Sequence, residues 1–349
     1  MRLPEITLIR HAQIGVIMKK ICLYIVLMIV VIILIPLILV RNFDVIQEQM
    51  QSKAKNANTS KVITVNVYMV DQKKTVKMNL EDYLIGVVAA EMPASFEMEA
   101  LKAQAVAART YALGRAVKLY GSSEAVHDGA DVCTSPAHCQ AWISKETAMR
   151  RWGLFSSFKY WNKICKAVNE TSGQIIEYNK VVINPLFHSN SGGHTENVED
   201  VWTGTAEPYL RGVESPGEDT FSEYKSEAVF EQSDMVKKLK EFNPEFKLTT
   251  SDILSSVEVK KYSSGDRVME MIIGNITIKG TDFRKIFQLK SANFKLSRQK
   301  DGRIAVTTFG YGHGVGMSQC GADYLAKQGY TYSDILKYYY KGVEINKIT

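Results

Sequence analysis

The longest apolar run of the chain lies close to its beginning. Residues 22–40 (CLYIVLMIVVIILIPLILV) contain no charged side chain, and this length suffices for a helix to cross the hydrocarbon core of a bilayer. Four basic residues precede the run, and no small-x-small cleavage site follows it. Since the more basic side of a span stays in the cytoplasm, we expect a cytoplasmic segment over 1–20, a transmembrane signal anchor over 21–40 and an extracytoplasmic remainder.

A polar stretch separates the predicted anchor from the rest of the chain. Residues 47–61 (QEQMQSKAKNANTSK) are mostly small or polar, which is typical of a tether. We place this tether at 41–61 and one folded domain at 62–349. Met18 precedes two lysines, and starts at Met1 and at Met18 both fit such an anchor.

The folded domain begins with an alternating segment followed by a helical pattern. Residues 62–70 (VITVNVYMV) alternate as a strand does, and Asn79 is a typical residue to cap a helix that Pro93 must end. Leu84, Val87 and Val88 then fall on one apolar stripe of this helix.

Glu91 continues the same stripe one turn later, so its carboxylate faces the protein. Burial and the negative end of the helix dipole both raise the pKa of a carboxyl group in the last turn. A carboxyl with a raised pKa can act as a general acid. The alternative is a structural ion pair with a neighbouring Lys or Arg, and this stretch alone supports both interpretations equally.

A second helix is expected to be capped by Ser95 and to stop near Gly121. Its stripe of mostly small residues allows close packing. Lys102 and Arg109 lie two turns apart on one face. They could hold Glu91 or contact a polar ligand, and a solvated basic face is the alternative.

The later part of the chain has the pattern of β-strands. Residues 257–280 predict hairpin strands around Ser-Ser-Gly-Asp, and 281–287 (TDFRKIF) predict a short helix. We therefore expect an α+β fold: the membrane anchor, then a helical part that carries Glu91, then a β-rich body.

Two thiols and two imidazoles lie within 13 residues, at His127, Cys133, His138 and Cys139. This is a complete tetrahedral set for structural zinc, with no ligand position left open for catalysis. A disulfide among the four outer cysteines at 133, 139, 165 and 320 is the alternative, because the domain is expected outside the cytoplasm. Zinc is favoured because a disulfide gives no reason for the two histidines.

Two polar segments rich in glycine follow the cysteines. Residues 187–202 (FHSNSGGHTENVEDVW) contain His188 and Ser189, and residues 309–322 (FGYGHGVGMSQCGA) contain His313 and the pair Ser318-Gln319. Glycines of this density allow tight turns and a close approach of the backbone to a ligand. The surroundings of Ser318 miss the G-x-S-x-G pattern by one residue, so a serine hydrolase is disfavoured.

The net charge of the chain after residue 40 argues against nucleic acid as a partner. After residue 40 the chain has 39 basic and 36 acidic residues. This near-neutral balance argues against nucleic-acid binding.

Four blocks of this sequence, in this order, resemble the stage II sporulation protein D family: AAEMP, ALKAQAVAARTYAL, FHSNSGGHTEN and GYGHGVGMSQCGA. The resemblance extends from about residue 62 to the C-terminus. It implies a membrane-anchored lytic transglycosylase that cuts peptidoglycan between N-acetylmuramic acid and N-acetylglucosamine, prefers strands without peptides, and helps the mother-cell membrane engulf the forespore. The expected partners are the glycan strands and stage II sporulation proteins P, an amidase, and M.

The resemblance also implies roles for individual residues. Glu91 matches the catalytic glutamate of the family, and the His/Cys group resembles a zinc site of clostridial members that other members lack. The positioning of substrate would fall to Lys102, Arg109, His188, Ser189, His313, Ser318 and Gln319. The same family includes enhancers of cell-wall amidases, so a binding module without catalysis is the alternative function.

One carboxylate suffices for the implied reaction. A glycosidase with two carboxylates needs a second acid across the bond, and no obvious partner for Glu91 appears nearby in the sequence. A lytic enzyme needs only one, because the C6 hydroxyl of muramic acid attacks in place of water and Glu91 gives and then takes the proton. Catalysis itself would then need no cofactor.

Overall fold

The computed structural model describes residues 63–119, 129–202, 204 and 206–348, together with Met28, Val30 and Ile32. The chain divides into two units, Met1–Val62 and Ile63–Thr349. The predicted anchor, apart from these three residues, and the tether lie outside the described residues. Within the part of the chain that is described, no helix has both the length and the apolar character to span a membrane.

The second unit begins with a small sheet that leads into the predicted helix. Strands β1 (Thr64–Met69) and β2 (Lys74–Asn79) are antiparallel, and β3 (Val132–Cys133) lies parallel to β1. Between β1 and β2 lies η1 (Val70–Gln72). Helix α2 (Leu80–Glu91) follows directly, with the Asn79 side chain accepting a hydrogen bond from the backbone N–H of Glu81 at 2.8 Å. The predicted cap and the predicted stripe are confirmed, since Leu84, Val87 and Val88 are fully buried.

Helix α3 (Met98–Ala116) differs from its prediction at both ends. Glu97 rather than Ser95 occupies the N-cap, without a side-chain cap bond, and the helix stops at Ala116. Ser95 lies instead in the turn that follows Pro93, and Leu119 is exposed. The small-residue stripe is buried as predicted and lets α3 pack closely in the helical core.

Helix α5 (Lys145–Glu170) packs against both α2 and α3 and is interrupted at Gly153, whose φ of 72° is not helical. The chain then forms the short sheet β14-β4-β5 and a small parallel pair. These elements and the remaining ones of this part are β4 (Gln174–Tyr178), β5 (Val181–Val182), β6 (Phe187–His188), α6 (Val198–Val201), η2 (Glu218–Thr220) and β14 (Glu344–Lys347).

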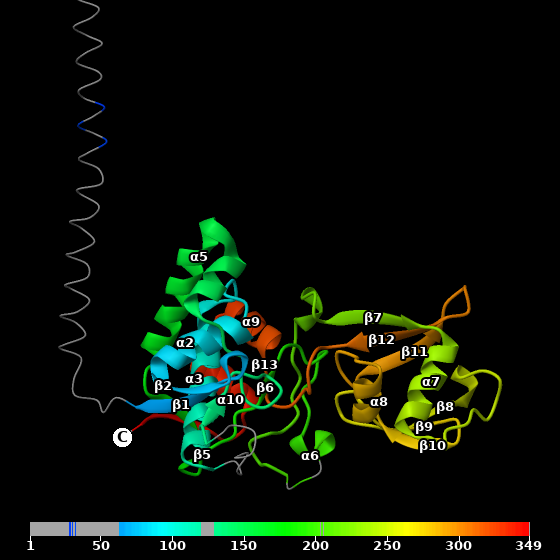
Figure 1. The fold of residues 1–349 in the computed structure, drawn as a ribbon. Coiled ribbons are helices and arrows are strands. Elements are labelled where there is room, and N and C mark those ends of the chain that lie inside the picture. Colours follow the sequence, from blue (N-terminus) through cyan, green and yellow to red (C-terminus); the bar gives the residue numbers. More distant parts are fainter. Residues whose placement is uncertain are drawn as a thin grey trace, which may run out of the picture. The chain divides into compact units, whose positions relative to one another are not determined.

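A second hydrophobic core forms within residues 225–309 (Figure 1). Its two sheets have the orders β10-β9-β8 and β11-β12-β7. The predicted hairpin and short helix are confirmed as β8, β9, β10 and α8. The elements of this core are β7 (Lys225–Phe230), α7 (Gln232–Phe242), η3 (Leu254–Ser256), β8 (Val257–Tyr262), β9 (Val268–Ile273), β10 (Ile276–Lys279), α8 (Gly280–Ile286), β11 (Phe294–Arg298) and β12 (Ile304–Phe309).

The glycine segment after β12 returns the chain to the first core. Strand β13 (Met317–Ser318) pairs in parallel with β6, with Ser318 opposite His188. Helices α9 (Gln319–Lys327) and α10 (Tyr332–Tyr339) then pack on α3. This pairing brings the two polar segments of the sequence together. The fold is a mixed α+β fold, as predicted.

Candidate active site

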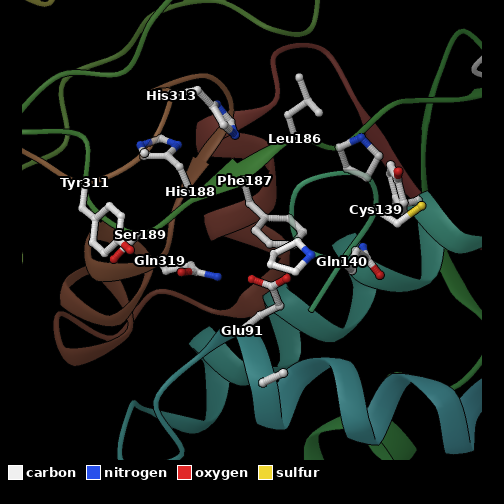
Figure 2. Close-up of a pocket in the computed structure, with 15 residues that line it drawn as sticks. Glu91, Cys139, Gln140, Leu186, Phe187, His188, Ser189, Tyr311, His313 and Gln319 are labelled. Atoms are coloured by element: carbon white, nitrogen blue, oxygen red, sulfur yellow. The ribbon is translucent and has the colours of Figure 1, made fainter. Parts of the chain in front are cut away.

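Glu91 lies at the edge of a cavity of about 510 Å³. Figure 2 shows its carboxylate on one wall, with His188 and His313 on the opposite side and Gln319 projecting between them. Both polar segments of the sequence therefore meet the predicted acid. The other residues that line this cavity include Tyr111, Cys139, Gln140, Leu186, Phe187, Ser189 and Tyr311.

A second cavity, of about 290 Å³, also contains Glu91 in its wall. It shares Ser189, Tyr311 and Gln319 with the first. Its own lining includes Phe96, Arg151, Trp152 and Glu223, none of which the sequence pattern singled out. Glu91 thus lies where the two cavities meet.

Burial determines the protonation of Glu91. The side chain is half-buried at the last residue of α2, and burial raises its pKa to about 7. The backbone N–H of Ala141 donates a hydrogen bond to Oε1 at 2.5 Å, which acts in the opposite direction. The alternative ion pair is not formed, because no Lys or Arg among the described residues pairs with Glu91.

The two histidines of the cavity are both held neutral. Burial, followed by the nearby Arg267 and Arg284 cations, lowers the pKa of His313 to about 3. Burial and the same neighbours lower the pKa of His188 as well. The Nδ1 of His188 lies 3.1 Å from the carbonyl oxygen of Val315 and donates to it, whereas the Nδ1 of His313 accepts from the Val315 N–H at 3.1 Å. The two rings therefore carry their protons on different nitrogens.

Ser318 and Gln319 have different surroundings although they are neighbours. Gln319 reaches the cavity and donates from Nε2 to Oε1 of Gln104 at 3.2 Å. Ser318 is fully buried, caps α9 and donates to the Glu218 carboxylate. Ser318 does not line either cavity around Glu91.

Glu218 organises the loop that the sequence pattern left unexplained. It is only 1% exposed. Its Oε2 accepts hydrogen bonds from Ser191 Oγ at 2.6 Å and from the backbone N–H groups of Ser191, Gly192 and Gly193 at 2.8 to 3.1 Å. Since its Oε1 also accepts from Ser318, one buried carboxylate ties the two polar segments together. No local pattern could indicate this tie, because the partners of Glu218 in the two polar segments lie 25 to 100 residues away.

Lys102 and Arg109, the two residues of α3 that were predicted to bind substrate, do not line the cavities. Arg109 is fully buried and pairs with Glu81 through two hydrogen bonds of 2.6 and 2.8 Å, so it does not contact Glu91. Lys102 pairs with Glu99 and Glu170, each at 2.8 Å. The role of Lys102 and Arg109 in substrate binding stays a prediction. Their ion pairs with glutamates give both residues a structural role.

Three of the four predicted zinc ligands are described, and His127 lies outside the described residues. The thiols of Cys133 and Cys139 are within hydrogen-bond reach of one another, and burial raises the pKa of Cys133 to about 11. Neither cysteine forms a disulfide within the described residues. Among these same residues, no three His, Cys, Asp or Glu side chains are gathered as a metal site.

Comparison with known proteins places these residues in a family. The family model described as Stage II sporulation protein (SpoIID) matches residues 68–178, which include Glu91, Cys133 and Cys139. Stage II sporulation protein D of Bacillus subtilis (strain 168) is 39% identical over 297 residues, covering 84% of this chain and 82% of that protein. The chain belongs to the stage II sporulation protein D family.

Other relatives agree with this assignment and extend it. Stage II sporulation protein D of Bacillus amyloliquefaciens is 37% identical over 285 residues, covering 82% of this chain and 79% of that protein. The Amidase enhancer of Bacillus subtilis (strain 168) is 28% identical over 310 residues, but the match covers only 40% of that protein. The chain is thus a sporulation protein of the stage II D family and more distantly similar to an amidase enhancer.

Proposed function

We propose that this member of the stage II sporulation protein D family is a lytic transglycosylase. It cuts the bond between N-acetylmuramic acid and N-acetylglucosamine in peptidoglycan, preferably in strands without peptides, during engulfment. The observation that carries the proposal is the state of Glu91: a half-buried carboxyl with a pKa of about 7, without a cationic partner, between two cavities.

The reaction needs only this carboxyl. Protonated Glu91 gives its proton to the glycosidic oxygen, and the bond from that oxygen to C1 of muramic acid breaks. The C6 hydroxyl oxygen of the same sugar bonds to C1, and its proton passes to the Glu91 carboxylate. The products are a 1,6-anhydro end and a free 4-hydroxyl, and Glu91 is again protonated. The Ala141 N–H supports the second half, because it stabilises the carboxylate.

The remaining polar residues of the cavity bind rather than react. His188 and His313 stay neutral near pH 7 and offer hydrogen bonds without charge, and Ser189 and Gln319 add a hydroxyl and an amide. Trp202 contacts His313 with ring centroids 5.0 Å apart and the ring planes tilted by 51°, and this contact keeps the His313 ring in place.

The proximity of Cys133 and Cys139 supports a proposed structural zinc site completed by His127 and His138. When bound, the metal would supply folding free energy rather than chemistry. Tyr111, whose hydroxyl donates to the His138 carbonyl at 3.3 Å, lines the cavity as Cys139 does. Such a site would therefore brace one wall of the cavity.

The location and partners of the protein follow from the same proposal. The apolar run at 22–40 would anchor the chain in the mother-cell membrane, with Glu91 outside the cytoplasm. The expected protein partners are stage II sporulation protein P, which would remove peptides before the cut, and stage II sporulation protein M.

Glu91→Gln tests the catalytic role. The amide keeps the shape of the side chain and its hydrogen bonding but cannot deliver a proton, so cleavage should fall by at least about 1000-fold while glycan binding survives. Mass spectrometry of digested strands is the measurement, and 1,6-anhydromuramyl ends are the expected product of the unchanged protein.

The same digest separates the alternatives. Reducing ends would indicate a hydrolase. Intact strands together with a faster amidase would indicate a binding module, which the similarity to the Amidase enhancer makes the second candidate. Turnover of Glu91→Gln at the rate of the unchanged protein would refute the role of Glu91.

A further inference from the structure

Gln140 lines the larger cavity together with Glu91, and the sequence pattern did not single it out. Its side chain is 1% exposed. Neither Oε1 nor Nε2 has a hydrogen-bond partner among the described residues. A complete amide, with both its acceptor and its donor unused, is thus held at the wall of the proposed active site.

Without a ligand, the unpaired amide of Gln140 destabilises the folded protein. A buried polar atom without a partner costs about 1 to 3 kcal/mol, and the great majority of such atoms in proteins do have partners. An apolar side chain of the same length would fill the space without this cost. The described residues give this amide no partner, and a ligand that brings its own donor and acceptor would supply one.

The position of Gln140 relative to Glu91 narrows the choice of ligand. The next residue, Ala141, holds the Glu91 carboxyl through its backbone N–H. Acid and amide are therefore fixed by one short segment, and Figure 2 shows them on the same side of the cavity below Phe187. A group that meets Gln140 must lie close to the bond that Glu91 protonates.

We infer that Gln140 recognises the 2-acetamido group of the sugar whose bond is cut. This inference rests on the function proposed above. The acetamido N–H would donate to Oε1 of Gln140, and the oxygen on the neighbouring C3 of the same sugar would accept from Nε2. The acetamido nitrogen is attached to C2, the carbon next to the reacting C1, so this pairing aligns C1 with Glu91.

The residues near Gln140 in this cavity can contact the acetyl methyl of the acetamido group. The same cavity contains Leu186 and Phe187 and two prolines, Pro136 and Pro185, against which the acetyl methyl can pack. No Lys or Arg among the described residues lines this cavity, so none of these residues favours a carboxylate there. The amide atoms lie just below the surface, and a change of side-chain torsion must turn them toward the sugar, a motion that is fast in proteins.

The test compares strands that differ only in this group. Three samples of peptide-free glycan are compared. The first is used as isolated, the second after chemical removal of its N-acetyl groups, and the third after the removed groups have been restored by chemical re-acetylation. The unchanged protein should cut acetylated and re-acetylated strands at equal rates and deacetylated strands at least about 10-fold more slowly, because a site built for a polar group rejects a ligand without it.

Gln140→Met is the decisive variant. It keeps the length of the side chain and removes both polar atoms. It should lower kcat/KM on acetylated strands by about 10- to 100-fold, as expected for two lost hydrogen bonds, and lower it clearly less on deacetylated strands, where only one of the two bonds is lost. Gln299→Met is the control variant. It removes an amide that donates to Glu227 in the part of the chain that forms the second core, and it should leave the preference for acetylated strands unchanged.

Thermal unfolding separates recognition from a structural role. Because two unpaired polar atoms disappear, Gln140→Met should melt at the same temperature as the unchanged protein or higher. A lower melting temperature, equal cutting of acetylated and deacetylated strands by the unchanged protein, or an intact preference in Gln140→Met would each overturn the inference. All three leave the proposed function standing, whereas intact strands with the unchanged protein would refute that function itself.

Discussion

At the scale of single residues, the protonation of Glu91 links structure to pH. Burial favours the neutral form and moves its pKa from 4.5 to about 7. A general acid works only while it is protonated. The buried carboxyl also affects folding, because the folded state binds a proton more tightly than the unfolded state does.

We expect cleavage to fall as pH rises through about 7, with kcat/KM measured from pH 5 to 9. Stability should change in the same direction. The contribution of Glu91 is complete below pH 4.5 and is lost as pH rises through about 7. At pH 8, where the buried charge must form, Glu91→Gln should therefore be more stable than the unchanged protein by about 1 to 3 kcal/mol in denaturant unfolding. Equal stability at pH 8 would contradict the raised pKa.

The spacing of residues along the sequence predicted that Glu91 faces the protein. It did not predict the surroundings of Arg109, Gln140 and Glu218, and the reason is physical. The position of Glu91 follows from a helical stripe, which needs only four neighbouring residues. The same spacing assigned Arg109 to a basic face, whereas it is fully buried against Glu81, 28 residues away. Gln140 and Glu218 were missed because their importance lies in partners that are absent or distant in the chain.

At the scale of elements, helix α2 is held against the segment that carries Gln140 and Ala141. Gly86 makes this contact possible, since a Cβ at this position would lie 2.1 Å from Nε1 of Trp142. The Gly86 carbonyl also accepts a hydrogen bond from the Ile143 N–H at 3.2 Å. The close approach fixes the distance between the end of α2 and the Ala141 N–H that holds Glu91.

Gly86→Ala should lower stability, although Ala normally favours a helix over Gly by about 1 kcal/mol. The methyl group overlaps the indole of Trp142, and overpacking of this kind costs about 1 to 3 kcal/mol. Chemical denaturation measures the loss. The double variant Gly86→Ala with Trp142→Leu should recover part of it relative to Trp142→Leu alone, and no recovery would place the strain elsewhere.

Element prediction succeeded where periodicity was strong. Helix α2 and the hairpin of β8 and β9 lie where the pattern predicted them. The start of α3 was placed two residues too early, because Ser95 is a good capping residue by type but lies in the turn after Pro93, and Glu97 is the N-cap. The metal site and the anchor stay predictions.

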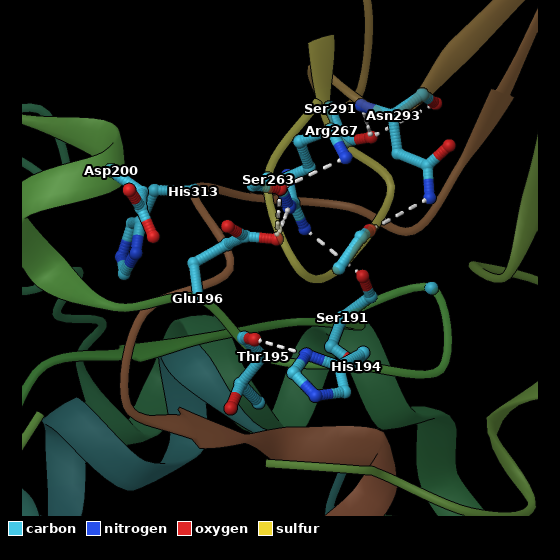
Figure 3. A network of polar contacts seen from close by, with 12 residues as sticks. Ser191, His194, Thr195, Glu196, Asp200, Ser263, Arg267, Ser291, Asn293 and His313 are labelled. Carbon is cyan, nitrogen blue, oxygen red and sulfur yellow. Dashed lines mark hydrogen bonds and ion pairs between the residues drawn. The ribbon is translucent and has the colours of Figure 1, made fainter. Parts of the chain in front are cut away.

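At the scale of the whole second unit, one buried arginine joins its two hydrophobic cores (Figure 3). Arg267, in the loop between β8 and β9, donates to the carbonyl of Gly312 at 3.2 Å and to that of Ser191 at 3.0 Å. Its Nε lies 3.5 Å from Oε1 of Glu196. Burial raises the pKa of Glu196 to about 7 even beside this cation. The carbonyl contacts therefore hold the glycine segment that carries His313.

Arg267→Met should cost about 3 kcal/mol in denaturant unfolding and also slow cleavage, because two buried carbonyls and Glu196 lose their donor. Glu196→Gln should cost about 1 kcal/mol or less, since the amide can keep the hydrogen bond from Ser263. If the two variants lost equal free energy of unfolding, the ion pair between Arg267 and Glu196 would join the two cores, and the contacts of Arg267 with the two carbonyls would not.

The meeting of the two cavities at Glu91 has a consequence for the cell wall. Under the proposed function, an acid with a cavity on each side would engage a strand away from its ends. Cuts in the interior halve long chains instead of trimming them, so the load-bearing mesh loosens after few events. A membrane that advances along such a wall would need only sparse, local breakage, and most of the polymer would remain in place to guide it.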